Sequence, residues 1–179
     1  MNFFRLKNFS NEKTEKLKNI LLSLNLTNIF NPCYKEYKKN HYICFRADSE
    51  FKYKHPDSYI IILDENYQII TLQKLNNLYN KKYGIHKVFD PKFCELNDAI
   101  FLTFNTGPNV NGNNFYLAEI NKDFPRPKKC IYEERMLMEK NWAFYNFNDK
   151  LMAIYSLKPL ITLEASVIKK DKKIGRAHV

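Results

Sequence analysis

Three stretches of the chain share one pattern of hydrophobic and polar positions and align over 17 residues without a gap. They cover residues 31–47, 90–106 and 141–157, so their starts lie 59 and 51 residues apart. Each begins with a small polar residue, has an aromatic residue three positions later, and passes through a polar segment into an apolar run rich in β-forming residues. Because Asn and Asp favour tight turns, this pattern predicts three similar β-hairpins.

Further strands are predicted between these hairpins. Residues 58–63 and 67–72 form another hairpin, and single strands follow at 114–120 and 160–165. Four strands in a period of about 50 to 60 residues are typical of a β-propeller blade. The pattern therefore predicts an all-β fold, a partial propeller of about two to three blades. A β-sandwich or meander in which three hairpins look alike is the alternative.

The segment before the first repeat predicts a short amphipathic helix over residues 11–24, capped by Ser10. One face of this helix is apolar, and we expect it to pack against the side of the propeller. That face consists of Leu17, Ile20, Leu21 and Leu24. The chain then divides into an N-terminal segment (1–30), an incomplete propeller (31–168) and a charged tail (169–179).

The last six residues, 174–179, differ in composition from the rest because they need G/C-rich codons. They resemble the translation of a common sequencing adapter. We therefore expect the natural protein to continue past about Lys173 with further blades, and His178 carries no functional argument.

Composition and charge exclude more than they identify. The net charge of +10 comes mostly from Lys residues scattered in pairs, whereas nucleic-acid readers favour Arg, so we expect neither a nucleic-acid partner nor a membrane partner. Four Cys residues lack metal-site spacing and predict free thiols in a reducing compartment. The sequence shows neither a signal peptide nor an apolar run of membrane length, which favours a cytoplasmic protein. It does not indicate an oligomeric state.

Candidate chemistry lies where the first strands of successive blades meet around the propeller axis. Asn31, Asp90 and Asn141 open the three repeats, and their amides and carboxylate suit the hydroxyl groups of a sugar. The alternative is that Asn-Pro and Asp-Pro only begin turns. Further candidates for sugar binding lie in or beside the repeats: Arg46, Asn105 and Trp142. For Arg46 the alternative is a surface ion pair, and for Trp142 it is packing in the core.

Several short motifs in order resemble the five-bladed propellers of glycoside hydrolase family 130, the inverting mannoside phosphorylases and their hydrolase relatives. The resemblance covers about residues 31–164. The motifs are Asn31-Pro32, Phe45-Arg46-Ala47, Phe89-Asp90-Pro91-Lys92, Glu139-Lys140-Asn141-Trp142 and Tyr155-Ser156-Leu157-Lys158-Pro159.

The resemblance implies that Asp90 is the general acid and that Lys140, Asn141 and Trp142 face the cleft. A phosphorylase uses inorganic phosphate as co-substrate, and no other cofactor is expected. Lys92 stands where the family has Arg, and Lys contacts phosphate only as a point charge. The dispersed His41, His55 and His86 indicate no metal site.

Two functions from different classes remain open. The first is an enzyme acting on glycosidic bonds, a glycoside phosphorylase or hydrolase. The second is a carbohydrate-binding or glycan-assembly propeller without catalysis, favoured by the Lys92 departure. Nucleic-acid binding through the Lys surface is a third, less favoured hypothesis.

Overall fold

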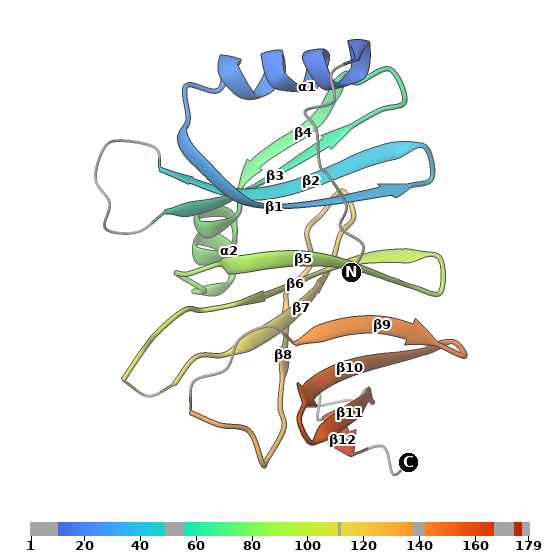
Figure 1. Ribbon diagram of the computed structural model, residues 1–179. Helices are drawn as coiled ribbons and strands as arrows, with labels where there is room; N and C mark the ends of the chain where they lie inside the picture. Colours follow the sequence, from blue (N-terminus) through green and yellow to red (C-terminus); the bar gives the residue numbers. More distant parts are fainter. Residues whose placement is uncertain (1–10, 49–55, 111, 138–141, 167–173, 177–179) are drawn as a thin grey trace, which may run out of the picture.

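The computed structural model describes residues 11–48, 56–110, 112–137, 142–166 and 174–176. Within these ranges, three antiparallel sheets of four strands follow one another along the chain (Figure 1). The first contains β1 (Thr27–Tyr37), β2 (Asn40–Asp48), β3 (Asp57–Leu63) and β4 (Ile69–Lys74). The second contains β5 (Phe89–Leu96), β6 (Ala99–Asn105), β7 (Phe115–Glu119) and β8 (Lys128–Cys130). The third contains β9 (Ala143–Phe147), β10 (Lys150–Leu157), β11 (Leu160–Ala165) and β12 (Ile174–Arg176).

The three predicted repeats form the first hairpin of each sheet: β1–β2, β5–β6 and β9–β10. In each hairpin two residues connect the strands, and both have positive φ, as tight hairpin turns of this twist require. The turn residues are Lys38 and Lys39, Asn97 and Asp98, and Asn148 and Asp149. Asn and Asp accept this conformation readily, whereas Lys adopts it against its preference.

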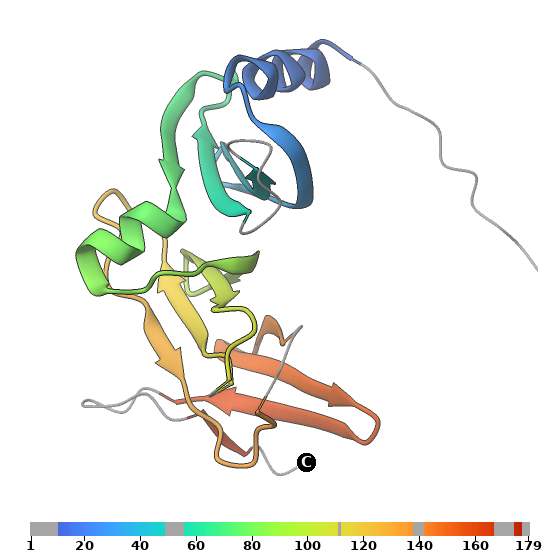
Figure 2. The ribbon, with the colours of Figure 1, turned by 90° about the vertical axis from the view of Figure 1, so that its left-hand side faces the viewer.

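Two hydrophobic clusters join successive sheets face to face. The larger contains Cys44 and Ile60 of the first sheet with Leu102 and Phe104 of the second. The smaller joins Phe115 of the second sheet to residues of the third. Figure 2 shows the sheets one after another, as blades of a propeller and not as the two layers of a sandwich. The predicted partial propeller is confirmed, and the sheets are called blades 1, 2 and 3 below.

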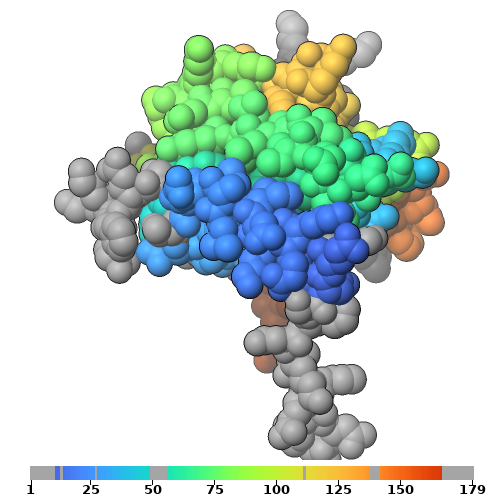
Figure 3. All heavy atoms as spheres, turned by 90° about the horizontal axis from the view of Figure 1, so that it is seen from above, coloured from blue at the N-terminus to red at the C-terminus, as the bar shows by residue number. Residues whose placement is uncertain are grey.

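Helix α1 (Glu12–Ser23) covers the face of blade 1 that points away from blade 2 (Figure 3). The predicted apolar face of the helix packs there against side chains such as Ile43, Phe45 and Ile61. The predicted cap is wrong. Asn11, not Ser10, is the N-cap, because its side chain accepts a hydrogen bond from the Thr14 amide while the Asn11 backbone amide donates one to Thr14 Oγ1. Ser10 lies outside the described residues.

Helix α2 (Leu75–Tyr83) and strand β8 were not predicted from the sequence. Leu75 and Tyr79 of α2 are fully buried between blades 1 and 2, and Gly84 ends the helix in the left-handed conformation. At the other end of the chain β12 pairs with β11 and so adds a fourth strand to blade 3. In the described part of the chain neither helix has the length and hydrophobicity needed to cross a bilayer.

Replacing Lys39 by Gly should raise the free energy of unfolding by about 0.5 kcal/mol. The variant gains about 1 kcal/mol because Gly adopts the left-handed conformation without strain. This gain exceeds the free-energy cost of the greater conformational freedom that Gly has in the unfolded chain. Urea unfolding measures the change.

Lys81→Gly is the matched control, because Lys81 is also exposed but lies in α2. It should lower the free energy of unfolding by about 1 kcal/mol, since Gly is unfavourable in a helix. Equal changes in the two variants would contradict the role assigned to the turn.

Candidate functional site

Asn31 and Asp90 occupy matching β-bulges in the innermost strands of blades 1 and 2. Phe30 pairs with Arg46 and Phe89 pairs with Asn105, and in both strands one extra residue follows before the regular pairing resumes. Both bulged residues have φ of 49°. A bulge redirects the side chain that it carries. Here it places the Asn31 amide and the Asp90 carboxylate beside each other.

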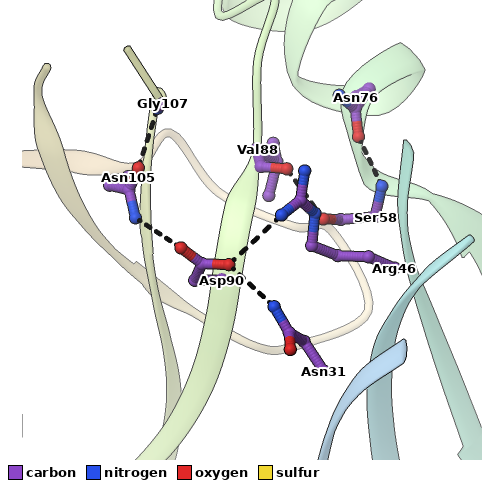
Figure 4. A network of polar contacts seen from close by, with 8 residues as sticks. All are labelled: Asn31, Arg46, Ser58, Asn76, Val88, Asp90, Asn105 and Gly107. Atoms are coloured by element: carbon purple, nitrogen blue, oxygen red, sulfur yellow. Dashed lines mark hydrogen bonds and ion pairs between the residues drawn. The ribbon is translucent and has the colours of Figure 1, made fainter. Parts of the chain in front are cut away.

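The Asp90 carboxylate accepts three side-chain hydrogen bonds from two blades (Figure 4). Oδ1 accepts from Asn31 Nδ2 at 3.1 Å and from the Arg46 guanidinium at 3.3 Å. Oδ2 accepts from Asn105 Nδ2 at 3.4 Å. The Asp90 side chain is still 27% exposed, so a molecule in solution can reach it.

The Arg46 guanidinium lies against two aromatic rings at equivalent positions of the repeat. Its Cζ atom is 5.1 Å from the Phe30 ring centre and 4.1 Å from that of Phe89. Burial lowers the pKa of Arg46, and Asp90 opposes part of this change by favouring the charged form. The Arg46 Nε atom is buried without a hydrogen-bond partner among the described residues. The ion pair and the rings together hold this cation between the two blades.

Asn105 is oriented by a second contact in addition to Asp90. Its Oδ1 accepts a hydrogen bond from the Gly107 amide at 2.7 Å, which leaves its Nδ2 directed at Asp90. Gly107 has φ of 67°, and a Cβ atom there would lie 3.0 Å from the Phe89 ring. Only Gly meets both constraints, so this residue fixes the wall of the site.

The connection that leads into β5 is attached to blade 1. Ser58 is buried, and its hydroxyl donates to the Val88 carbonyl at 2.7 Å. The Ser58 amide donates to Asn76 Oδ1 at 2.8 Å, which links the same point to α2 (Figure 4). Asp90 follows Val88 by two residues, so these bonds support its position relative to Arg46.

The structure brings together four of the predicted site residues: Asn31, Arg46, Asp90 and Asn105. Lys92 is an exposed residue of β5, two positions beyond Asp90. Lys140 and Asn141 lie outside the described residues.

The expectation that Trp142 faces the cleft does not agree with the structure, which favours the core-packing alternative. Trp142 is 1% exposed and stacks on Phe115 of blade 2 with ring centres 5.0 Å apart. Tyr155 meets the same indole edge to face. Burial of a large ring between two blades is strongly favourable, which explains its placement.

Sequence reasoning missed Phe30, Phe89 and Gly107. A signal existed, because extending the repeat by one residue toward the N-terminus aligns Phe30 with Phe89. Gly107 is one of only four Gly residues in the chain, and it follows a predicted strand. Within the described residues, no group of His, Cys, Asp and Glu side chains could hold a metal ion. Cys33, Cys44, Cys94 and Cys130 form no disulfide bond with one another.

No protein-family model matches the sequence, and no curated protein resembles it significantly. Among solved structures the chain resembles Zg3597, a family 117 glycoside hydrolase produced by the marine bacterium Zobellia galactanivorans. The TM-score is 0.55 at 12% sequence identity, over 83% of this chain and 45% of that chain. This likeness supports the fold.

Two weaker matches were also found. MPT-4, a mannose phosphorylase from Leishmania mexicana, has a TM-score of 0.43 at 10% identity, over 94% of this chain and 54% of that one. The GH32 β-fructofuranosidase BmSUC1 of Bombyx mori has a TM-score of 0.44 at 8% identity, over 84% and 38%. The chain covers about half or less of the length of each of these three proteins.

Replacing Gly107 by Ala tests the wall of the site. The free energy of unfolding should fall by about 1 kcal/mol because of left-handed strain. It should fall by roughly a further 1 to 3 kcal/mol because the added methyl group would press on Phe89. Denaturant unfolding gives the total.

Gly84→Ala is the matched control, because Gly84 has φ of 71° but its added Cβ would meet no atom within 4 Å. Its free energy of unfolding should fall only by the cost of the left-handed strain, about 1 kcal/mol. Similar losses in both variants would show that Gly107 does not pack closely on Phe89.

Proposed function

We propose that this chain belongs to a carbohydrate-active protein that binds an oligosaccharide over Asp90, between blades 1 and 2. One observation carries the proposal: a solvent-accessible carboxylate is held in place by donors from two blades. Carboxylate and amide groups fixed in this way are suited to hydroxyl groups, which both donate and accept hydrogen bonds. The fold shared with Zg3597, described as a glycoside hydrolase, supports the same class of ligand.

In the catalytic form of this proposal Asp90 is the general acid of a glycoside phosphorylase or hydrolase. It would give its proton to the glycosidic oxygen as the bond to the sugar breaks. In phosphorolysis inorganic phosphate attacks the sugar, and Lys92, the exposed cation two positions beyond Asp90 in β5, is the candidate contact for that anion. In hydrolysis a second carboxylate would have to activate water.

The second candidate is a carbohydrate-binding propeller without catalysis. Its support is the set of partners around Asp90, since Asn31, Arg46 and Asn105 all donate to the carboxylate. An ionised carboxylate only accepts hydrogen bonds and satisfies all three. A general acid must instead carry a proton of its own. The arrangement is thus directly suited to binding.

Asp90→Asn in the full-length protein separates these two functions. The Asn side chain keeps the shape of Asp but cannot donate a proton as an acid, so turnover of manno-oligosaccharides should fall by about a thousandfold or more while sugar binding remains. Turnover is measured with and without phosphate, and binding is measured by calorimetry.

Glu65→Gln is the control, because Glu65 is an exposed carboxylate in the turn before β4. It should change neither quantity. Binding without turnover in the wild-type protein would establish the non-catalytic alternative. Absence of both would contradict the proposed function.

A further inference from the structure

A cavity of about 250 Å³ lies between blades 2 and 3, at the end of the blades where the hairpin turns are. It is separate from the Asp90 site, which lies where the innermost strands begin. Its walls are mainly apolar and come from both blades, with Leu96, Phe101 and Leu117 on one side and Phe144 and Leu151 on the other. Neither function proposed above uses this space.

The interface between blades 1 and 2 shows what fills the same place one repeat earlier. There Tyr37 reaches across to blade 2, and its hydroxyl donates a hydrogen bond to the Asp98 carbonyl. Tyr42 packs edge to face against Phe93, with ring centres 6.2 Å apart, and Tyr37 meets Tyr42 at the same distance. Two phenol rings therefore occupy the first interface.

In the second interface smaller side chains stand at these positions. The repeat aligns Tyr37 with Leu96 and Tyr42 with Phe101. The opposite wall has the same residue types in both interfaces, because Phe144 of blade 3 corresponds to Phe93 of blade 2 and Asp149 corresponds to Asp98. All four of the corresponding residues line the cavity: Leu96, Phe101, Phe144 and Asp149. The cavity thus lies where a ring equivalent to that of Tyr37 would fit in the second interface. The turn at Asp149 provides the backbone carbonyl that would accept a hydrogen bond from the hydroxyl of such a ring.

We propose that this cavity binds a small phenolic molecule, whose ring takes the place of the missing tyrosine and whose hydroxyl donates to the backbone at Asp149. An apolar cavity of about 150 Å³ is enough to hold benzene, so 250 Å³ accommodates a substituted ring. Exposed Lys128 and Lys150 lie at the polar rim beside Asp149. Lys129, Ser166 and Glu164, which pairs with Lys150 at 3.0 Å, complete the polar part of the lining. The rest of the lining is apolar, which favours an aromatic body over a sugar.

Titration of the 179-residue chain with p-cresol, the side-chain analogue of tyrosine, tests the site. Amide chemical shifts in an NMR spectrum should move at Leu96, Phe101 and Leu151 and stay unchanged at Asn31 and Asp90. For a ligand of one ring the dissociation constant should be roughly millimolar. Shifts centred on Asp90 would overturn the proposal. The absence of any shift at about 10 mM ligand, which is roughly ten times the expected dissociation constant, would also overturn it.

Leu96→Tyr should restore the side chain seen in the first interface and so fill the cavity. The variant should bind p-cresol at least about tenfold more weakly, and its melting temperature should rise. Leu160→Tyr is the matched control, because Leu160 lies in blade 3 and is 68% exposed. It should bind as the wild type does. Unchanged binding in a folded Leu96→Tyr protein would contradict the assigned site, and the shift map of the wild type decides the matter if that variant does not fold.

Discussion

The contact between Arg46 and Asp90 links blades 1 and 2 at the end where their innermost strands begin. A buried guanidinium is costly unless it is paired, and Asp90 of the next blade supplies the opposite charge at 3.3 Å. Phe30 and Phe89 exclude water from the sides of this cation, so the pair is formed where charges interact more strongly than at an open surface. Any displacement of blade 2 relative to blade 1 would separate the guanidinium from the Phe89 ring and from the Asp90 carboxylate, both of which belong to blade 2.

The repeat explains why one interface carries polar chemistry at one end and aromatic packing at the other. The innermost strands of blades 1 and 2 each contain a bulge that turns an Asn or Asp side chain toward the other blade, and each ends in a tight turn. The same backbone therefore presents equivalent positions to each interface. At the turn end, the difference between the two interfaces lies in the side chains, as Tyr37 and Leu96 show.

The hairpins and their turns could be predicted because local sequence determines them: Asn97-Asp98 and Asn148-Asp149 favour the tight turns in which they are found. The proximity of Asn31 and Asp90 also followed from the repeat. The pairing of Arg46 with Asp90 could not be predicted, since it depends on a one-residue bulge that the pattern does not reveal.

Other features depend on tertiary packing. Helix α2 contains three Asn residues of low helix propensity and has no side-chain cap at its N-terminus, so it depends on the burial of Leu75 and Tyr79 between blades. Trp142 resembled a sugar platform in sequence, but an indole is stabilised as well by a protein ring such as Phe115. Sequence alone does not distinguish these two surroundings for the same residue type.

The position of α1 affects how a complete ring could form. Blades of a propeller pack face to face, and the free face of blade 1 is already occupied by the apolar side of this helix. A closing blade that approached from that side would meet the outer surface of α1, where Leu22 is 65% exposed, before it could reach the sheet. In a closed ring α1 would then lie between the first and last blades, or it would have to leave the face of blade 1 as the ring is completed.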